Sequence, residues 1–229
     1  MTIIFYDLCG KNGKRFSPFG WRTRMALAHK GLEPHVELVK FTEKSKVEFS
    51  GQKLVPVLKD EDTVVYDSFA IAEYLEDAYP DRPSLFGSPE GRGMAKAINN
   101  FVDMTIQIHM ANLIVADVAS NVDPACLDYF VSSREARFGK PLAEVQVGRE
   151  ERVEILRKSM EPIRRIVSEQ PFIGGDRPTY ADFPLFGTMQ WARCGSTFAI
   201  LDPNDPIRHW FERLLEDYDG VGKSEPAAG

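Results

Sequence analysis

The sequence predicts an α/β unit at the N-terminus followed by an all-helical unit, and three observations carry this prediction. Residues 2–67 hold β-branched and alternating apolar segments that are typical of strands. Residues 80–91 (PDRPSLFGSPEG) are rich in Pro, Gly and Ser, as linkers are. Later apolar residues recur at helical spacing, and no further segment reads convincingly as a strand. We therefore expect a domain over residues 1–80, a linker over 81–91 and a helical domain over 92–229.

The first half reads as strand, helix, strand, followed by two strands and a helix. Residues 2–7 (TIIFYD) predict a short strand, and apolar spacing predicts a helix over residues 18–30 that Gly31 ends. Residues 34–41 alternate like a strand, and residues 54–67 read as two short strands around an acidic turn. The segment SFAIAEYLEDAYP then predicts a helix that a proline ends.

The second half predicts a helical bundle. Residues 92–118 form a long apolar-rich helix, and residues 124–137 are a candidate for another. The segment VGREERVEILRKSMEPIRRIVSEQ is amphipathic, with opposite charges spaced to pair along a helix. The segments TYADFPLFGTMQWAR and DPIRHWFERLLEDY follow, and the tail VGKSEPAAG is expected to fray.

Composition excludes several classes of function. The chain has 229 residues, 43% of them hydrophobic and 27% charged, which is the balance of a soluble globular protein. A formal net charge of −6 provides no overall basic field for nucleic acid or anionic lipid. The apolar runs fall short of a membrane span, and the N-terminus lacks the pattern of an export signal. We therefore expect no nucleic-acid partner and no membrane association.

The cysteines and histidines point to a reducing compartment without a metal site. Cys9, Cys126 and Cys194 are odd in number and widely spaced, which argues against a disulfide framework and for a cytoplasmic protein. The four histidines have no ligand spacing with one another or with the cysteines, so no metal is expected.

Two positions raise the question of a binding site. Ser17 precedes Pro18 at the expected start of a helix, which is an ordinary arrangement for an N-cap. Pro56 interrupts the strand-like run LVPVL, although proline cannot donate to a β-ladder. An edge strand, a bulge and a cis-proline remain open. A cis Val55–Pro56 bond would turn the backbone N–H and C=O of Val55 outward.

Together, Ser17-Pro18, Val55-Pro56 and a third pair, Asp67-Ser68, resemble the cytosolic glutathione transferase family over essentially the whole chain. The resemblance implies a thioredoxin-like N-terminal domain (βαβ-ββα), an all-α C-terminal helical bundle and glutathione as co-substrate. It also implies a homodimer.

A second motif and several longer runs refine the resemblance. The segment GGDRPTYADF resembles the helix-capping motif of the family, with Thr179 and Asp182 placed as a capping box. The runs YDL, SPFGWRTRMALAHKG, DSFAIAEYLEDAYPDRP and SREARFGKPLAEVQVGREERV are similar to the bacterial β-etherase-like group. Enzymes of that group cleave β-aryl ethers of lignin-derived aromatics with glutathione.

The resemblance implies that the Ser17 hydroxyl donates a hydrogen bond to the sulfur of glutathione instead of capping its own helix. An ordinary thiol has a pKa of about 8.5. A helix N-terminus contributes roughly 0.3–1 kcal/mol to a nearby anion, and a charged hydrogen bond contributes about 1.5–3 kcal/mol. Since one pKa unit corresponds to ~1.4 kcal/mol, the two effects would lower the thiol pKa by about one to two units or slightly more. Arg15 and Arg22 could add to the field, and a solvated surface role is as plausible for each.

The remaining glutathione contacts are implied in the same way. Val55, held by Pro56, would pair its backbone with the cysteinyl unit. Asp67 and Ser68 would receive the γ-glutamyl group at a helix N-terminus, although their simplest role is a cap. The glycyl carboxylate needs a polar or cationic partner, for which three residues are candidates: Lys53, Gln52 and Lys40.

The second substrate is expected between the two domains, against apolar residues of the first helix and of the long helix. The candidates are Phe16, Phe19, Met104, Ile108 and Met110. If the etherase resemblance extends to chemistry, glutathione thiolate displaces a phenolate from a carbon beside a ketone, giving a thioether and a phenol. Two other functions stay open: a glutathione-dependent thiol transferase that uses Cys9, and a non-catalytic binding protein with the same fold.

Overall fold

A four-stranded mixed sheet forms the first layer of the molecule, in a computed structural model that describes residues 2–229. The strand order is β2-β1-β3-β4. β1 is parallel to β2 and antiparallel to β3, and β3 is antiparallel to β4. The predicted βαβ-ββα arrangement is confirmed. The strands are β1 (Ile3–Leu8), β2 (His35–Val39), β3 (Val57–Asp60) and β4 (Thr63–Tyr66).

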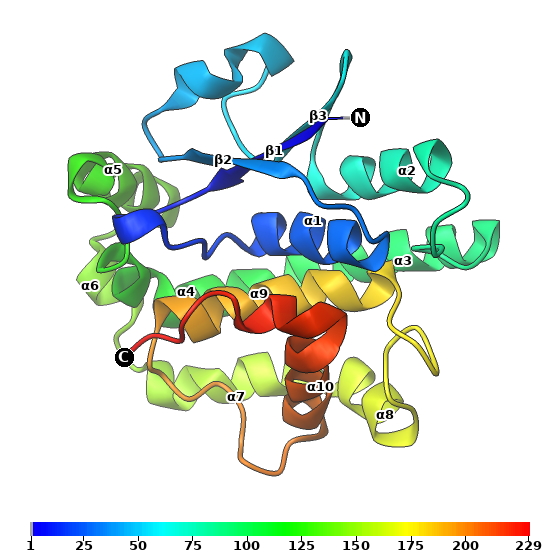
Figure 1. Ribbon diagram of the computed structural model, residues 1–229. Coiled ribbons are helices and arrows are strands. Elements are labelled where there is room, and N and C mark those ends of the chain that lie inside the picture. Colours follow the sequence, from blue (N-terminus) through cyan, green and yellow to red (C-terminus); the bar gives the residue numbers. More distant parts are fainter. Residues whose placement is uncertain (1) are drawn as a thin grey trace.

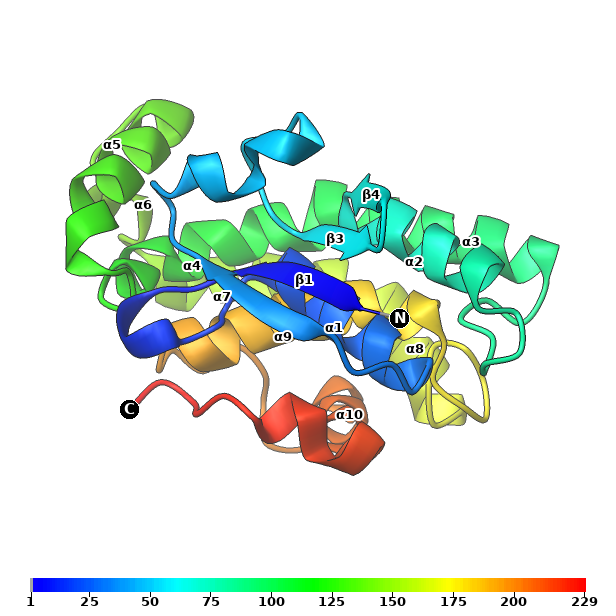
Figure 2. The same cartoon turned by 45° about the horizontal axis from the view of Figure 1, so that its top comes forward.

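Two helices, α1 (Pro18–His29) and α2 (Ser68–Ala78), cover one face of this sheet (Figures 1 and 2). On the other face, the 3-10 segment Lys44–Ser50 places Val47 against Val39 and Val57 in a small separate core. α1 is buried on nearly every side because it lies between the sheet and the helical unit.

The helical unit begins with one continuous helix over residues 89–119. Its parts are α3 (Pro89–Phe101), one π-helical turn (Val102–Ile106) and α4 (Gln107–Ala119). At 31 residues it is long and apolar enough, by length and composition alone, to cross a membrane, contrary to the sequence-based expectation. Core helices of bundles share this composition, and α4 packs against α6, α7 and α9.

The remaining helices complete the bundle. In Figure 1, α4 and α9 lie under the first α/β layer, and α7, α8 and α10 lie below them. The amphipathic segment after residue 146 forms two helices, α7 and α8, because Pro162 starts a new one. The helices are α5 (Leu127–Phe138), α6 (Leu142–Val145), α7 (Arg149–Ser159), α8 (Glu161–Glu169), α9 (Phe183–Gly195) and α10 (Pro206–Gly220).

α9 is the element of the helical unit that packs most closely against α1. Gly187 permits this approach, since a Cβ there would overlap the carbonyl oxygen of Pro18. The helix starts at the predicted capping box, which is confirmed: the Thr179 side chain accepts from the backbone, and Asp182 accepts from the Thr179 N–H. The fully buried Asp182 also accepts from the Trp210 indole at 2.8 Å, which ties α9 to α10.

The C-terminal tail is docked, so the prediction that it frays is wrong. Glu225 is only 7% exposed and pairs with Arg15 at 2.8 Å. Arg193 donates to the Glu225 carbonyl oxygen, and its own carbonyl oxygen accepts from the Ala228 N–H. Ion pairs that join the two ends of the chain hold the tail against α1 and α9.

Candidate functional site

Three loops converge at one end of the sheet. The β1–β3 register pairs Tyr6 with Val57, so the end of β1 lies beside the start of β3. The β3–β4 register pairs Val57 with Tyr66, which brings Val55-Pro56 and Asp67-Ser68 to the same end of the hairpin. The chain that leaves β1 here leads to the start of α1.

A cavity of about 320 Å³ opens beside this convergence, between the α/β unit and the helical unit. Its wall combines the loop before α1, the segments around β2 and β3, and residues of α4, α5 and α9. Among the lining residues are Leu8, Phe16, Ser17, Phe19, Val55, Ala111, Val115, Phe130 and Trp191. An apolar cleft between two units with a few polar groups is the usual form of a small-molecule site.

Ser17 lines this cavity at the N-terminus of α1 and is 5% exposed. Its Oγ accepts a hydrogen bond from the Gly20 N–H at 3.2 Å, so the hydroxyl caps its helix, which the sequence-based expectation had excluded. Capping uses an oxygen lone pair and leaves the hydroxyl proton to donate. Accepting one hydrogen bond also polarises the O–H for a second. Capping and donation to a thiolate are therefore compatible.

The Val55–Pro56 peptide bond is cis, which decides between the three alternatives that the sequence left open. Val55 and Lys53 line the cavity, whereas Gln52 lies outside the lining. Lys40 also lines it and forms an ion pair with Asp123 of the helical unit at 2.8 Å.

Asp67 and Ser68 lie at the start of α2, outside the cavity lining. Asp67 has φ 74° and caps the helix, because its Oδ1 accepts from the N–H groups of Phe69 and Ala70. The structure thus gives Asp67 its simplest role, and the shared hairpin end keeps it close to Val55-Pro56.

Only two of the five predicted substrate contacts line the cavity, Phe16 and Phe19. The other three lie outside this lining. Met110 is fully buried in the core, and Met104 and Ile108 are 75% and 50% exposed. The predicted helix does line the cavity, through a face that carries Gln107, Ala111, Val115 and Val118.

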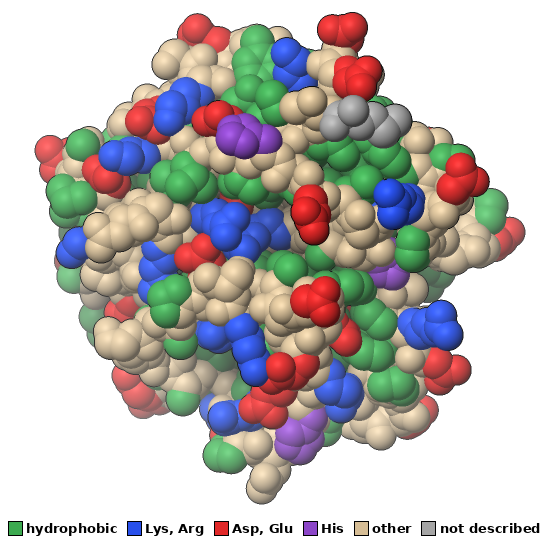
Figure 3. Space-filling view, in the orientation of Figure 1, with side chains coloured by type: hydrophobic (Ala, Val, Ile, Leu, Met, Phe, Trp, Pro, Cys, Tyr) green, Lys and Arg blue, Asp and Glu red, His purple; other side chains and the backbone are tan. Residues whose placement is uncertain are grey.

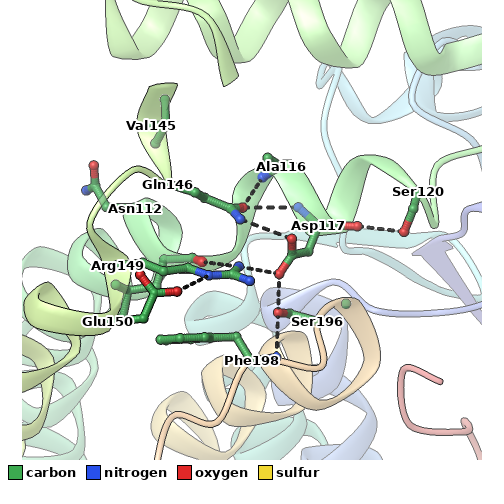
Figure 4. Close-up of polar contacts among 12 residues, drawn as sticks. Asn112, Ala116, Asp117, Ser120, Val145, Gln146, Arg149, Glu150, Ser196 and Phe198 are labelled. Atoms are coloured by element: carbon green, nitrogen blue, oxygen red, sulfur yellow. Dashed lines mark hydrogen bonds and ion pairs between the residues drawn. The ribbon is translucent and has the colours of Figure 1, made fainter. Parts of the chain in front are cut away.

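A polar network holds the cavity-lining end of α4 (Figure 4). Arg149 donates to Asp117 Oδ2 at 2.6 Å, and Ser196 donates to the same oxygen at 2.5 Å. Gln146 donates to Asp117 Oδ1 and accepts from two backbone N–H groups of α4. Burial raises the pKa of Asp117, but these hydrogen bonds outweigh it and the net pKa is lowered. The network therefore anchors the turn of α4 that also carries Val115 and Val118.

Arg15 and Arg22 each form an ion pair with an acidic side chain. Arg15 pairs with Glu225. Arg22 is completely buried rather than solvated, and its guanidinium donates to Asn99, to Asp103 at 2.6 Å and to Gln107. It joins α1 to the long helix across the interface between the two units.

Cys9 is a poor nucleophile in this structure. It is 3% exposed, and burial, followed by the charge of Glu43, raises its pKa to about 11. A thiol transferase needs a thiolate near neutral pH, which this environment disfavours. Within residues 2–229, no group of three His, Cys, Asp or Glu residues is placed to hold a metal ion.

The fold and the site define a protein that binds a small molecule where a thioredoxin-like unit meets a helical one. Comparison with known families agrees. The model of the glutathione S-transferase N-terminal domain matches residues 16–78, and the model of the C-terminal domain matches residues 93–202.

Individual relatives support the same family. The probable glutathione S-transferase GSTU1 of Oryza sativa subsp. indica is 38% identical over 222 residues, covering 92% of this chain and 86% of that protein. The glutathione S-transferase-like protein ustS of Aspergillus flavus is 30% identical over 138 residues, and the matched part spans only 49% of its length. The chain belongs to the glutathione S-transferase family, whose co-substrate is glutathione.

Solved structures share the architecture. Glutathione transferase GSTFuA2 from Phanerochaete chrysosporium has a TM-score of 0.76 and 28% identity, covering 96% of this chain and 93% of that one. CsGST63524 of Ceriporiopsis subvermispora, solved in complex with glutathione, has a TM-score of 0.81 at 23% identity, covering 96% and 97% of the two chains. At that identity the second likeness shows the fold alone.

Proposed function

We propose that this chain is a glutathione transferase in which Ser17 stabilises the thiolate of glutathione for attack on a hydrophobic aromatic electrophile. The observation that carries the proposal is the placement of the Ser17 hydroxyl. It lines the cavity at the N-terminus of α1, accepts from Gly20 and keeps its proton for the sulfur. The helix N-terminus adds a favourable field for the same anion.

The tripeptide would lie along the converging loops. The backbone of Val55, before the cis-proline, would pair with the cysteinyl unit, and the start of α2 at Asp67 and Ser68 would receive the γ-glutamyl group. Lys53 would hold the glycyl carboxylate, because it lines the cavity two residues before Val55 while Lys40 is already paired with Asp123.

The reaction we propose is the one of the β-etherase-like group. The thiolate attacks a carbon beside a ketone, a C–S bond forms, and the C–O bond breaks as the phenolate leaves with its electron pair. The cavity is lined by the aromatic residues Phe16 and Trp191, against which an aryl ether would pack well.

We further propose a cytoplasmic homodimer built from the domains at residues 1–80 and 92–229. The support for a dimer is a set of exposed apolar side chains along α3, the π-turn and the start of α4 that the cavity does not use: Met94, Met104 and Ile108.

The test is a turnover screen with glutathione over aryl halides and β-aryl ether ketones. The expected result is conjugation that Cys9→Ser retains and Ser17→Ala reduces. Retention on immobilised glutathione with no turnover of any electrophile would instead identify a binding protein.

A further inference from the structure

The charged side chains that line the cavity are all positive. Its wall includes five cationic side chains and, within residues 2–229, no aspartate or glutamate. The whole chain has a formal net charge of −6, and acidic and basic side chains are interspersed over much of the face in Figure 3. A cationic cavity in an acidic protein favours an anionic occupant. The five side chains are Lys40, Lys44, Lys53, Arg134 and Arg137.

Glutathione accounts for only part of this charge. Lys40 is neutralised by Asp123, and Lys53 is the residue that we assign to the glycyl carboxylate. The other three cationic side chains form no ion pair with an acidic side chain anywhere in residues 2–229: Lys44, Arg134 and Arg137.

Arg134 of α5 contacts two aromatic rings of the cavity wall. Its guanidinium lies over the Phe130 ring at 4.6 Å and over the Phe41 ring at 5.3 Å. Its Nη1 donates to Ser133 Oγ at 3.0 Å, and within residues 2–229 the guanidinium makes no other hydrogen bond, so its remaining N–H groups are available to a ligand. Burial lowers the pKa of Arg134, because desolvation disfavours the charged form, and a bound anion would offset that cost.

The apolar side chains of the cavity indicate the kind of ligand that would carry an anionic group to Arg134. Phe41 and Phe130 contact Arg134, and Phe138 of α5 and Ala111 and Val115 of α4 line the same cavity. A planar ring fits such a wall, and a planar carboxylate on that ring matches the guanidinium fork.

We propose that the second substrate is an aromatic electrophile that bears a carboxylate, which Arg134 binds while the thiolate attacks from the Ser17 side. This inference rests on the proposed function and names the substrate class of the same cavity. Lys44 and Arg137 raise the local positive potential around that carboxylate.

The test compares chloronitrobenzoate with its methyl ester, which has the same ring and leaving group but no charge. In each reaction a C–S bond forms and chloride leaves with the electron pair of the C–Cl bond. The kcat/KM of each compound is divided by its uncatalysed rate with glutathione, which removes their difference in intrinsic reactivity. We expect the carboxylate to exceed the ester by roughly 10-fold or more, the size of one charged hydrogen bond.

Arg134→Met should abolish this ratio, and Arg134→Lys, which keeps the charge but not the fork, should give an intermediate ratio. Arg165→Met, which removes a 78% exposed arginine of α8, is the matched control and should leave both values unchanged. A ratio near one in the wild type, or Arg134 variants that lower both compounds by the same factor, would overturn the proposal. Turnover of neither compound, together with no turnover of other aryl halides or ether ketones, would instead count against the proposed function.

Discussion

Replacing Asp7 with asparagine should make the protein gain stability relative to the wild type as the pH rises toward neutral. Asp7 lies in β1 under the first turn of α1, 1% exposed, and no side chain of residues 2–229 donates a hydrogen bond to its carboxylate. Burial raises its pKa from 3.8 to about 6, although the charges of Arg24 and Arg15 oppose the shift. At neutral pH the folded state therefore holds a buried carboxylate at a cost.

The magnitude follows from the pKa. A shift of roughly two units at ~1.4 kcal/mol per unit corresponds to about 3 kcal/mol. Because the pKa of Asp7 is raised on folding, its contribution to stability is fully present below about pH 4 and is lost as the pH rises through about 6. The Asn variant has no such loss.

Urea unfolding of both proteins between about pH 4 and pH 8 measures the effect. The free energy of unfolding of Asp7→Asn minus that of the wild type should rise by about 3 kcal/mol over this range and then level off. Other titrating groups are common to both proteins, and the unpaired amide adds an offset that does not depend on pH. A difference that is constant, or that falls as the pH rises, would show that the Asp7 carboxyl is not destabilised by burial.

Three further substitutions test other parts of the account. Cys9→Ser should leave conjugation intact, and loss of all activity in a turnover assay would reinstate the thiol transferase. Gly20→Ala should destabilise by about 1–3 kcal/mol in urea unfolding, because a Cβ would overlap the Asp7 carboxylate. Gly93→Ala is the control for Gly20→Ala, because Gly93 lies in α3 and an added Cβ would meet no atom within 4 Å. It should stabilise the protein by about 0.5–1 kcal/mol. Asp117→Asn should lower the thermal midpoint by roughly 3–6 °C at neutral pH, and the difference should shrink as the pH falls below about 4, since the pKa of this carboxyl is lowered on folding.

Local patterns in the sequence predicted most elements of the fold. The strand of residues 2–7 and the helix that Gly31 ends were both readable, because alternation and helical spacing are local signals. The capping box at Thr179 and Asp182 was readable for the same reason. Pro56 showed only that something departs from a regular strand, and the cis bond was one of three alternatives.

The wall of the cavity was less predictable. The long helix is apolar on more than one face, so composition alone could not tell the buried Met110 from the cavity-lining Ala111. Helical spacing from Gln107 to Ala111 and Val115 marks the correct face only once the neighbouring elements are known.

Contacts between side chains that are far apart in the chain could not be predicted from the sequence. Phe41 and Arg134 meet across the cavity although the loop after β2 and α5 are far apart in the chain. Glu225 reaches Arg15 over an even longer separation, which is why a tail that looked frayed is docked. Such contacts depend on the packing of the two units and not on any local pattern.

If the Ser17 hydroxyl lowers the thiol pKa of bound glutathione, an ultraviolet pH titration of the thiolate absorbance in the complex will show it. Ser88-Pro89 provides a matched control, because Ser88 caps α3 by accepting from the Gly91 N–H at 3.1 Å, outside the cavity. Ser17→Ala and Ser88→Ala should each lose about 1 kcal/mol of stability as caps. Only Ser17→Ala should raise the thiol pKa, by about one to two units. An unchanged thiol pKa in Ser17→Ala, or an equal shift in both variants, would contradict the account.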